Sequence, residues 1–384
     1  MHSCMMQMCI IHLCIMNPFS FGKVVTQSDF CERPDLVKQL RTGLESGQNC
    51  VLLGERRTGK TSLIHESVRR LRSFRLLYAQ FWAVKSIDDV AARLLRGITS
   101  MQARKSWLER IGSTLSHLRP VIEFDPMSGQ PNVTIAPGTK LTPSGLDAVF
   151  DLIGEISQSR RIVVALDEFQ DIQDVPDASA VLGAMRARIQ QQSQASYVFA
   201  GSIRHEMEKI FRDPSSPFFK SLQCIEVGAI RREAFQKHLD KKFRSGRRIV
   251  SQEAFDMIFE LADDNPSDVQ QLCSAVWATT AFKNEVWTSE IQTALQRIMA
   301  TERKGYEVLL NPLTSNQQKV LKALATEGGA RPQSKAFMAA TGISLPASVK
   351  RALTRLVNLQ IIYGPASNYK FFDPFLKQWI MREL

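Results

Sequence analysis

Hydrophobic and polar positions alternate between two patterns over residues 50–227. Short runs of consecutive apolar residues are separated by longer stretches in which apolar residues recur every three or four positions. The short runs are typical of buried parallel strands, and the longer stretches are typical of helices that cover both faces of such a sheet. The sequence therefore predicts an α/β fold with strands at residues 50–53, 75–81, 162–166, 197–200 and 224–227.

The pattern changes at several places along the chain. Residues 119–143 are rich in Pro, Gly and Thr, and we expect an inserted hairpin there, with strands at 121–124 and 133–135 and a turn at 127–130. From residue 231 the apolar spacing becomes helical, which predicts a small helical lid. The predicted domains are a disordered or spurious extension at 1–15 with the working start at Met16, a core at 16–229, a lid at 230–310 and a last unit at 311–384.

The last unit combines helical spacing with a hairpin. We expect Gly342 to end the second of its helices and Ser344 to be the N-cap of the third, which runs to residue 360. A hairpin that turns at 364–368 follows, so the sequence predicts a winged helix-turn-helix. The third helix presents Lys350, Arg351 and Arg355, which could contact duplex DNA. Docking of a protein is the alternative use of such a module.

A glycine-rich motif directly follows the first strand. Residues 54–61 match G-x-x-x-x-G-K-[ST], the loop whose backbone N–H groups surround the phosphates of a nucleotide at the start of a helix. Lys60 would contact the β- and γ-phosphates, and Thr61 would bind Mg²⁺ through its hydroxyl. The predicted nucleotide-binding residues are Gly54, Glu55, Arg56, Arg57, Thr58, Gly59, Lys60, Thr61 and Ser62.

Two further strands end in polar residues. The strand at 162–166 is followed by Asp167 and Glu168, which matches a Walker B motif. We expect Asp167 to hold Mg²⁺ and Glu168 to orient the attacking water. The strand at 197–200 leads to Ser202, which would lie beside the γ-phosphate and report whether it is present. Because parallel strands end at one edge of the sheet, the catalytic set is predicted to be Lys60, Glu168 and Ser202.

Charge and composition narrow the choice of partners. The net charge is +11 and the pI is near 9.4, which favours polyanionic partners. Residues 311–384 contain ten basic and three acidic residues, so they carry +7 of that charge. The seven cysteines form no CxxC pair, which is typical of reduced thiols rather than of disulfides or zinc sites. No run of 18 apolar residues is present, so we expect a cytoplasmic protein with no membrane span.

Taken in order, these motifs resemble the archaeal-type ATPases of the AAA+/STAND group of P-loop NTPases, which are relatives of the Orc1/Cdc6 ATPases. The resemblance covers nearly the whole chain from Met16. It is carried by Asn17-Pro18-Phe19, Phe21-Gly22, Phe30-x-x-Arg33-x-x-Leu36, residues 54–62, Leu166-Asp167-Glu168-Phe169-Gln170, Ala200-Gly201-Ser202, Ser215-Ser216-Pro217-Phe218, Asp264-Asn265-Pro266, Gln270-Gln271-Leu272 and Leu376-Lys377-Gln378-Trp379.

The resemblance implies ATP as the ligand, a strand order of 5-1-4-3-2 and a segment at 21–33 that wraps the adenine side. It also marks two departures. Phe219-Lys220 stands where related ATPases often have an arginine finger. Residues 265–268 stand where Orc-like proteins place a sensing arginine at the start of a lid helix; Asn265 as N-cap and Pro266 at the first helical position explain that segment instead. Arg204 and Arg212 are the available substitutes.

These inferences predict a molecular switch that binds and hydrolyses ATP with Mg²⁺. Two alternatives stay open. One is an ATP-gated DNA-binding regulator with little or no turnover, and the other is a signalling or defence scaffold that uses the winged helix for protein contacts. The partners that follow are ATP, duplex DNA, and a protein partner or a second copy of the chain.

Overall fold

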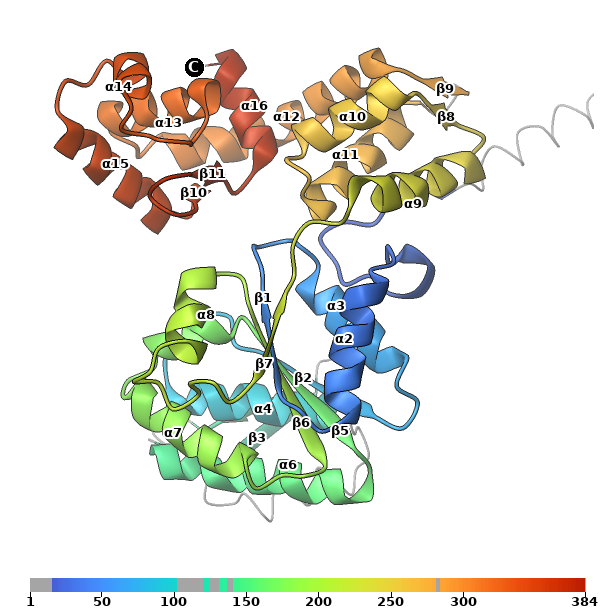
Figure 1. The fold of residues 1–384 in the computed structure, drawn as a ribbon, viewed down its shortest axis with the longest axis vertical. Coiled ribbons are helices and arrows are strands. Elements are labelled where there is room, and N and C mark those ends of the chain that lie inside the picture. The colour runs from blue at the N-terminus through green and yellow to red at the C-terminus, as the bar shows by residue number, and fades with distance from the viewer. Residues whose placement is uncertain (1–15, 102–119, 125–130, 137–140, 281–283, 384) are drawn as a thin grey trace, which may run out of the picture. The chain divides into compact units, whose positions relative to one another are not determined.

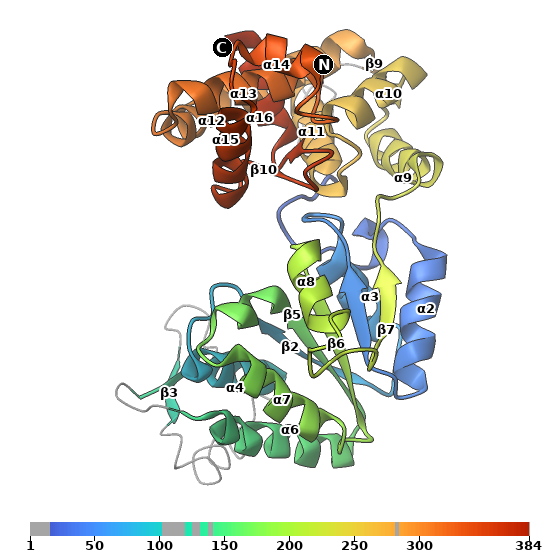
Figure 2. The same cartoon turned by 60° about the vertical axis from the view of Figure 1, so that its left-hand side comes forward.

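The computed structural model describes residues 16–101, 120–124, 131–136, 141–280 and 284–383. The chain forms two compact units (Figures 1 and 2). One comprises Val24–Gly228, and the other joins the segment up to Lys23 to Ala229–Leu384. The predicted extension at 1–15 lies outside the described residues.

The first unit is built on a parallel sheet. Its strands are β1 (Cys50–Leu53), β2 (Arg75–Gln80), β5 (Ile162–Asp167), β6 (Ala195–Gly201) and β7 (Gln223–Glu226). They lie in the order β2-β5-β6-β1-β7, and every neighbouring pair is parallel. Numbered along the chain, this order is 5-1-4-3-2, so the strand order implied by the resemblance is confirmed.

Helices cover both faces of this sheet (Figure 1). Alternate residues of β1 belong to different hydrophobic clusters: Val51 packs with α4 (Ile87–Met101), α6 (Asp147–Ser159) and α7 (Ala178–Ile189), whereas Leu52 packs with α2 (Pro34–Glu45) and α3 (Lys60–Arg69). Because successive side chains of a strand point to opposite faces, a strand that is apolar at every position needs a cover on both.

The insertion between β2 and β5 contains a hairpin. β3 (Pro120–Phe124) and β4 (Pro131–Ile135) pair antiparallel, as expected for residues 119–143. The predicted turn at 127–130 lies outside the described residues. Two short helical turns, η3 (Pro143–Leu146) and η4 (Phe169–Asp174), and α8 (Arg204–Phe211) complete the elements that bear on the site.

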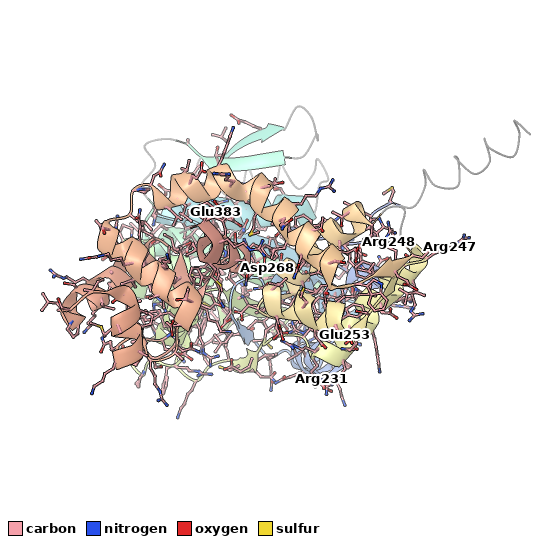
Figure 3. The ribbon with its side chains drawn as sticks, turned by 90° about the horizontal axis from the view of Figure 1, so that it is seen from above. Arg231, Arg247, Arg248, Glu253, Asp268 and Glu383 are labelled. Carbon is pink, nitrogen blue, oxygen red and sulfur yellow. The ribbon has the colours of Figure 1, made fainter. Side chains whose placement is uncertain are left out.

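The second unit begins with a helical half. It contains α9 (Arg232–Ser245), α10 (Gln252–Leu261), α11 (Pro266–Thr279) and α12 (Thr288–Leu310), with β8 (Ile249–Val250) paired to β9 (Glu285–Val286). Asn265 is the N-cap of α11, where its side chain accepts from the Ser267 N–H at 3.1 Å, and Pro266 follows it, as predicted. Arg248, labelled in Figure 3, lies 3.7 Å from the centre of the Trp277 ring. Residues 16–23 belong here as well, since the Asn17 amide donates to Ser274.

The C-terminal half contains α13 (Ser315–Glu327), α14 (Lys335–Thr341), α15 (Pro346–Asn358), the hairpin of β10 (Ile362–Tyr363) and β11 (Lys370–Phe371), and α16 (Pro374–Glu383). This is the predicted winged helix with one further helix. Gly342 ends α14 at φ 62°, as expected. The N-cap of α15 is Leu345 rather than the predicted Ser344, because Pro346 takes the first helical position, where its fixed φ suits the helix.

The lid and the winged helix share one compact unit. Near the end of α12, the Tyr306 hydroxyl donates to Asp373 at 2.9 Å and its ring lies 5.8 Å from that of Trp379 on α16. The boundaries predicted at 229/230 and 310/311 stay predictions, and α12 ends at Leu310, next to the second one. No helix in the described part of the chain is long and apolar enough to cross a membrane.

Candidate functional site

Three polar segments meet at the carboxyl edge of the sheet. Leu53, the last residue of β1, is level with Gly201 of β6, and β6 in turn lies beside β5, which ends at Asp167. The loop of residues 54–59, the acidic pair after β5 and Ser202 after β6 therefore lie at neighbouring strand ends, as the sequence predicted. In parallel α/β sheets, ligands bind outside this edge.

The loop after β1 requires glycine at two places. A Cβ at Gly54 would lie 2.3 Å from the Val227 carbonyl oxygen, and Gly59 has φ 87° at the N-cap of α3. The Thr58 hydroxyl donates to the Glu55 carbonyl at 2.9 Å and closes the loop. The loop thus leads directly into the first turn of a helix, where free N–H groups and the helix dipole favour an anion.

Lys60 lies inside this loop. Its Nζ donates to the carbonyl oxygens of Gly54 at 3.0 Å and Glu55 at 2.7 Å, and its side chain is buried. Burial lowers the pKa of Lys60, although Glu168 and Asp167 oppose that change. In this arrangement the ammonium group is held by neutral carbonyls, and an anion entering the loop would be a stronger partner.

Asp167 joins the two predicted motifs. Its Oδ2 accepts from the Thr61 hydroxyl at 2.6 Å, across 106 residues of sequence. The same oxygen accepts from the Tyr78 hydroxyl at 2.9 Å. Burial, and then the nearby Asp167 charge, raise the pKa of Tyr78, so this hydroxyl stays a donor. Sequence reasoning missed Tyr78, whose only signal is its place on the strand next to β5.

Glu168 is fixed by two side chains. Its Oε2 accepts from the Ser202 hydroxyl at 2.6 Å and from the Gln170 amide at 2.8 Å. Its backbone has φ 51°, a conformation uncommon for a residue other than glycine. Ser202 was predicted for this region, whereas the contact of Gln170 was not, although Gln170 belongs to the motif that carried the resemblance.

The segment before α2 lies against the loop and α3. The Val25 N–H donates to Ser62 Oγ at 3.1 Å, and the Gln27 N–H donates to Glu66 at 2.9 Å. The Arg33 guanidinium donates to the carbonyl of Thr58 at 2.8 Å and also to that of Gly228. Residues 24–33 thus flank the loop, which is where the resemblance places a base-binding segment.

The remaining predicted residues fall into two groups. In the loop, Glu55 and Arg57 are exposed, and the Arg56 guanidinium lies 5.2 Å from the centre of the Trp82 ring. The other group, Lys350, Arg351 and Arg355, is exposed on α15 of the second unit.

The oxygen atoms of Thr61 and Asp167 suit Mg²⁺. Mg²⁺ is a hard cation that usually takes one or two protein oxygens and completes its shell with water and substrate phosphates. Thr61 and Asp167 supply two such oxygens at the sheet edge, so this pair fits a cation that arrives with a nucleotide.

Comparisons with known proteins agree with this geometry. Residues 304–382 match the family described as a probable winged helix domain. A Walker-type ATPase of Pyrococcus abyssi matches with a TM-score of 0.64 at 17% identity, over 95% of this chain and 99% of that one. No curated protein matches the sequence.

Two ORC proteins of Aeropyrum pernix also match. The ORC2 protein, in its ADPNP-ADP complexes, gives a TM-score of 0.56 at 12% identity, with 92% of each chain covered. The ORC1 protein in complex with DNA gives 0.51 at 14% identity, with 93% of this chain and 94% of that one covered. At such identities the likeness shows the fold. The predicted resemblance and the fold class, a P-loop ATPase sheet with a C-terminal winged helix, are confirmed.

Proposed function

We propose that this protein is a Mg²⁺-dependent ATPase that acts as a nucleotide-controlled switch. The observation that carries the proposal is the 2.6 Å hydrogen bond from Thr61 to Asp167, which joins a P-loop to a Walker B strand end. ATPase relatives of the same fold support it. Thr61 and Asp167 are 106 residues apart in the sequence, and they are the two side chains expected to bind Mg²⁺. Their contact is therefore the arrangement that a Mg-ATP site requires.

The loop and Lys60 bind the phosphates in this account. Backbone N–H groups of residues 54–62 surround the β-phosphate at the start of α3. The Lys60 ammonium leaves the Gly54 and Glu55 carbonyls, which hold it at 3.0 and 2.7 Å, for oxygens of the β- and γ-phosphates. Because a charged hydrogen bond to phosphate is stronger than one to a neutral carbonyl, this exchange favours the bound state.

The acidic pair has two roles. Thr61 and Asp167 would hold Mg²⁺, which would supply positive charge to the phosphates during the reaction. Glu168 orients a water molecule for attack on the γ-phosphorus and accepts its proton, while the bond from that phosphorus to the β–γ bridging oxygen breaks and ADP leaves. Ser202 now donates to Glu168 at 2.6 Å, and a γ-phosphate would compete for that hydroxyl and free the carboxylate for water.

The proposal is tested by steady-state ATP hydrolysis with the full chain. We expect turnover that requires Mg²⁺ and is lost in EDTA, and a loss of at least tenfold in Asp167→Asn. Asp174→Asn, which changes an exposed carboxylate a few residues away, is the matched control and should hydrolyse ATP like the wild type. A wild-type protein that binds ATP and stays inactive with Mg²⁺ would contradict the enzymatic part.

A second function is favoured by the winged helix. We propose that α15 contacts duplex DNA through Lys350, Arg351 and Arg355, all exposed, so that the nucleotide state gates DNA binding. The match to a winged-helix family and to ORC1 in complex with DNA supports this use. Measuring duplex affinity at several salt concentrations tests it: a steep decrease with salt is expected for phosphate contacts. A salt-independent or absent interaction would favour protein docking instead.

A further inference from the structure

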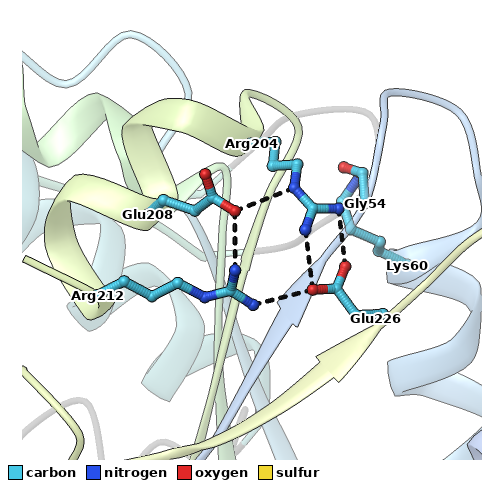
Figure 4. Close-up of polar contacts among 6 residues, drawn as sticks. All are labelled: Gly54, Lys60, Arg204, Glu208, Arg212 and Glu226. Carbon is cyan, nitrogen blue, oxygen red and sulfur yellow. Dashed lines mark hydrogen bonds and ion pairs between the residues drawn. The ribbon is translucent and has the colours of Figure 1, made fainter.

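A ring of charged residues lies beside the phosphate loop. Arg204 is the first residue of α8, and Glu226 is the last residue of β7. Leu53 of β1 is level with both Gly201 of β6 and Glu226, because β1 lies between these two strands. A contact from Arg204 to Glu226 therefore passes over the tip of β1, where the loop begins. Figure 4 draws this contact together with Gly54 and Lys60 of the loop.

The contacts in the ring are specific. Arg204 binds Glu226 with two nitrogens, at 2.9 and 3.0 Å, and its Nε donates to Glu208 at 3.1 Å. Arg212 donates to Glu208 and to Glu226, each at 3.0 Å (Figure 4). Two arginines and two glutamates thus balance each other, and Arg204 has its charge fully compensated at the edge where the triphosphate is proposed to bind.

The ring is built to open. The side chains of Arg204 and Glu226 are 49% and 50% exposed, and ion pairs of that exposure are weak because solvent screens them. A triphosphate brings several negative charges and oxygens that an arginine can bind with two nitrogens. Arg212 follows the last residue of α8, so its Cα lies about 12 Å along the helix from that of Arg204, and its guanidinium reaches the same two glutamates from the other side of the ring (Figure 4). It can therefore keep both glutamates neutralised once Arg204 has left.

We propose that the ion pair between Arg204 and Glu226 forms only while no γ-phosphate is present. When ATP binds, Arg204 leaves Glu226 and binds the γ-phosphate instead. The ring then discriminates ATP from ADP within one chain. Arg204 follows Ser202 by two residues, so both would read the same phosphate. The inference rests on the proposed function, and it gives this chain an arginine in cis, where Phe219-Lys220 provides none.

The test compares equilibrium affinities for ATP and ADP, both with Mg²⁺, in the full chain. Arg204→Gln should weaken ATP about tenfold and leave ADP within about twofold, because ADP has no γ-phosphate. Glu226→Gln removes the competing acid and should strengthen ATP about threefold. Arg212→Gln is the matched control: it removes the same charge from the same ring and should leave the ratio of the two affinities within about twofold. Retained ADP binding shows that each variant is folded.

Glu226 could affect ATP affinity by competing for Arg204 or by repelling the nucleotide through its own negative charge. The double variant Arg204→Gln with Glu226→Gln distinguishes these two effects. If Glu226 acts through Arg204, the gain from Glu226→Gln disappears when Arg204 is absent. A gain that persists without Arg204, or an Arg204→Gln protein with an unchanged ratio, would overturn the exchange and leave the proposed ATPase intact. A wild type that binds neither nucleotide would overturn the proposed function itself.

Discussion

The carboxyl edge of the sheet in the first unit and the basic face of α15 in the second were predicted from the same sequence, but the fold constrains them differently. At the edge, Lys60 and Asp167 are 6% and 4% exposed, and each has defined partners. On α15, Lys350, Arg351 and Arg355 are exposed to solvent. Because a buried charge without a partner is costly, burial dictates the geometry of the edge. Exposed side chains are not held in one geometry by their neighbours, so the role of the α15 face depends on its charge and on the partner that binds it.

At the sheet edge, nucleotide binding and hydrolysis should depend on individual functional groups. On α15, DNA binding should depend on the total positive charge of the exposed face. Changes that keep shape and alter one functional group should have large effects in the first region. In the second region, one substitution should do little and several together should act additively.

The largest effect is expected from Glu168→Gln. This change keeps the size of the side chain and removes the group that accepts the proton, so turnover should fall about 100-fold or more while ATP affinity stays within about threefold. Single-turnover hydrolysis and equilibrium binding measure the two effects. Glu45→Gln, an exposed change in the same unit, is the control. Equal losses of binding and turnover would show that Glu168 supports the structure of the site instead.

Acid should destabilise the first unit through Glu66. Hydrogen bonds from Arg69, against the effect of burial, and from the Gln27 N–H hold the pKa of this carboxylate near 2, below its ordinary 4.5. A depressed folded pKa contributes stability above the unfolded value and loses it as the pH falls toward the folded one, so stability should decline between about pH 5 and pH 2. With Arg69 half exposed, the contribution is about 2 kcal/mol.

Denaturant unfolding of the full chain at pH 7, 5 and 3.5 measures this effect. Glu66→Gln should lower stability at pH 7 and flatten the acid dependence. A wild type whose stability is unchanged between pH 7 and 3.5 would show that Glu66 is not a source of the stability of this unit.

A smaller effect is expected from α15. Changing Lys350, Arg351 and Arg355 together to Ala should weaken duplex binding about tenfold at 0.15 M salt and lower the slope of log affinity against log salt by about 2.7. Replacing Lys319, Lys322 and Arg382 removes equal charge from α13 and α16. If both triple variants weaken binding alike, the effect is net charge, and α15 is not the DNA-contacting helix.

The smallest effect is expected from Tyr78→Phe. It removes one of the two hydroxyls that donate to Asp167 Oδ2, so the Mg²⁺ concentration for half-maximal ATP binding should rise about threefold. Tyr197→Phe removes another buried hydroxyl of the same sheet, one that donates to Gln192 at 2.7 Å, and serves as the control. An equal response of both variants would mean that Tyr78 acts through sheet stability alone.

The sequence predicted the position of those site residues that are neighbours along the chain. Lys60 and Thr61 are fixed by a loop of adjacent residues, and Asp167 and Glu168 by the end of one apolar strand, so local patterns located all four. Strand order then followed from the resemblance. The structure adds that lid and winged helix share one unit, joined by Tyr306 and Asp373.

Contacts between distant segments could not be predicted in the same way. Tyr78 meets Asp167 because β2 lies beside β5, and Arg204 meets Glu226 because β1 lies between their strands. Both contacts depend on sheet order and register, which no local pattern of residues encodes. The N-cap of α15 was misplaced for a local reason, since Pro346 outweighed the capping preference of Ser344.

The central claim is that the buried edge is a Mg-ATP site, and calorimetric titration of Mg-ATP into the full chain tests it most directly. We expect one ATP to bind per chain, and Lys60→Ala to weaken that binding about 100-fold, because it removes the ammonium group that the loop carbonyls of Gly54 and Glu55 hold. Lys38→Ala, an exposed change on α2, should bind as the wild type does. A folded wild type that binds no ATP, or a Lys60→Ala protein that binds it unchanged, would contradict the account.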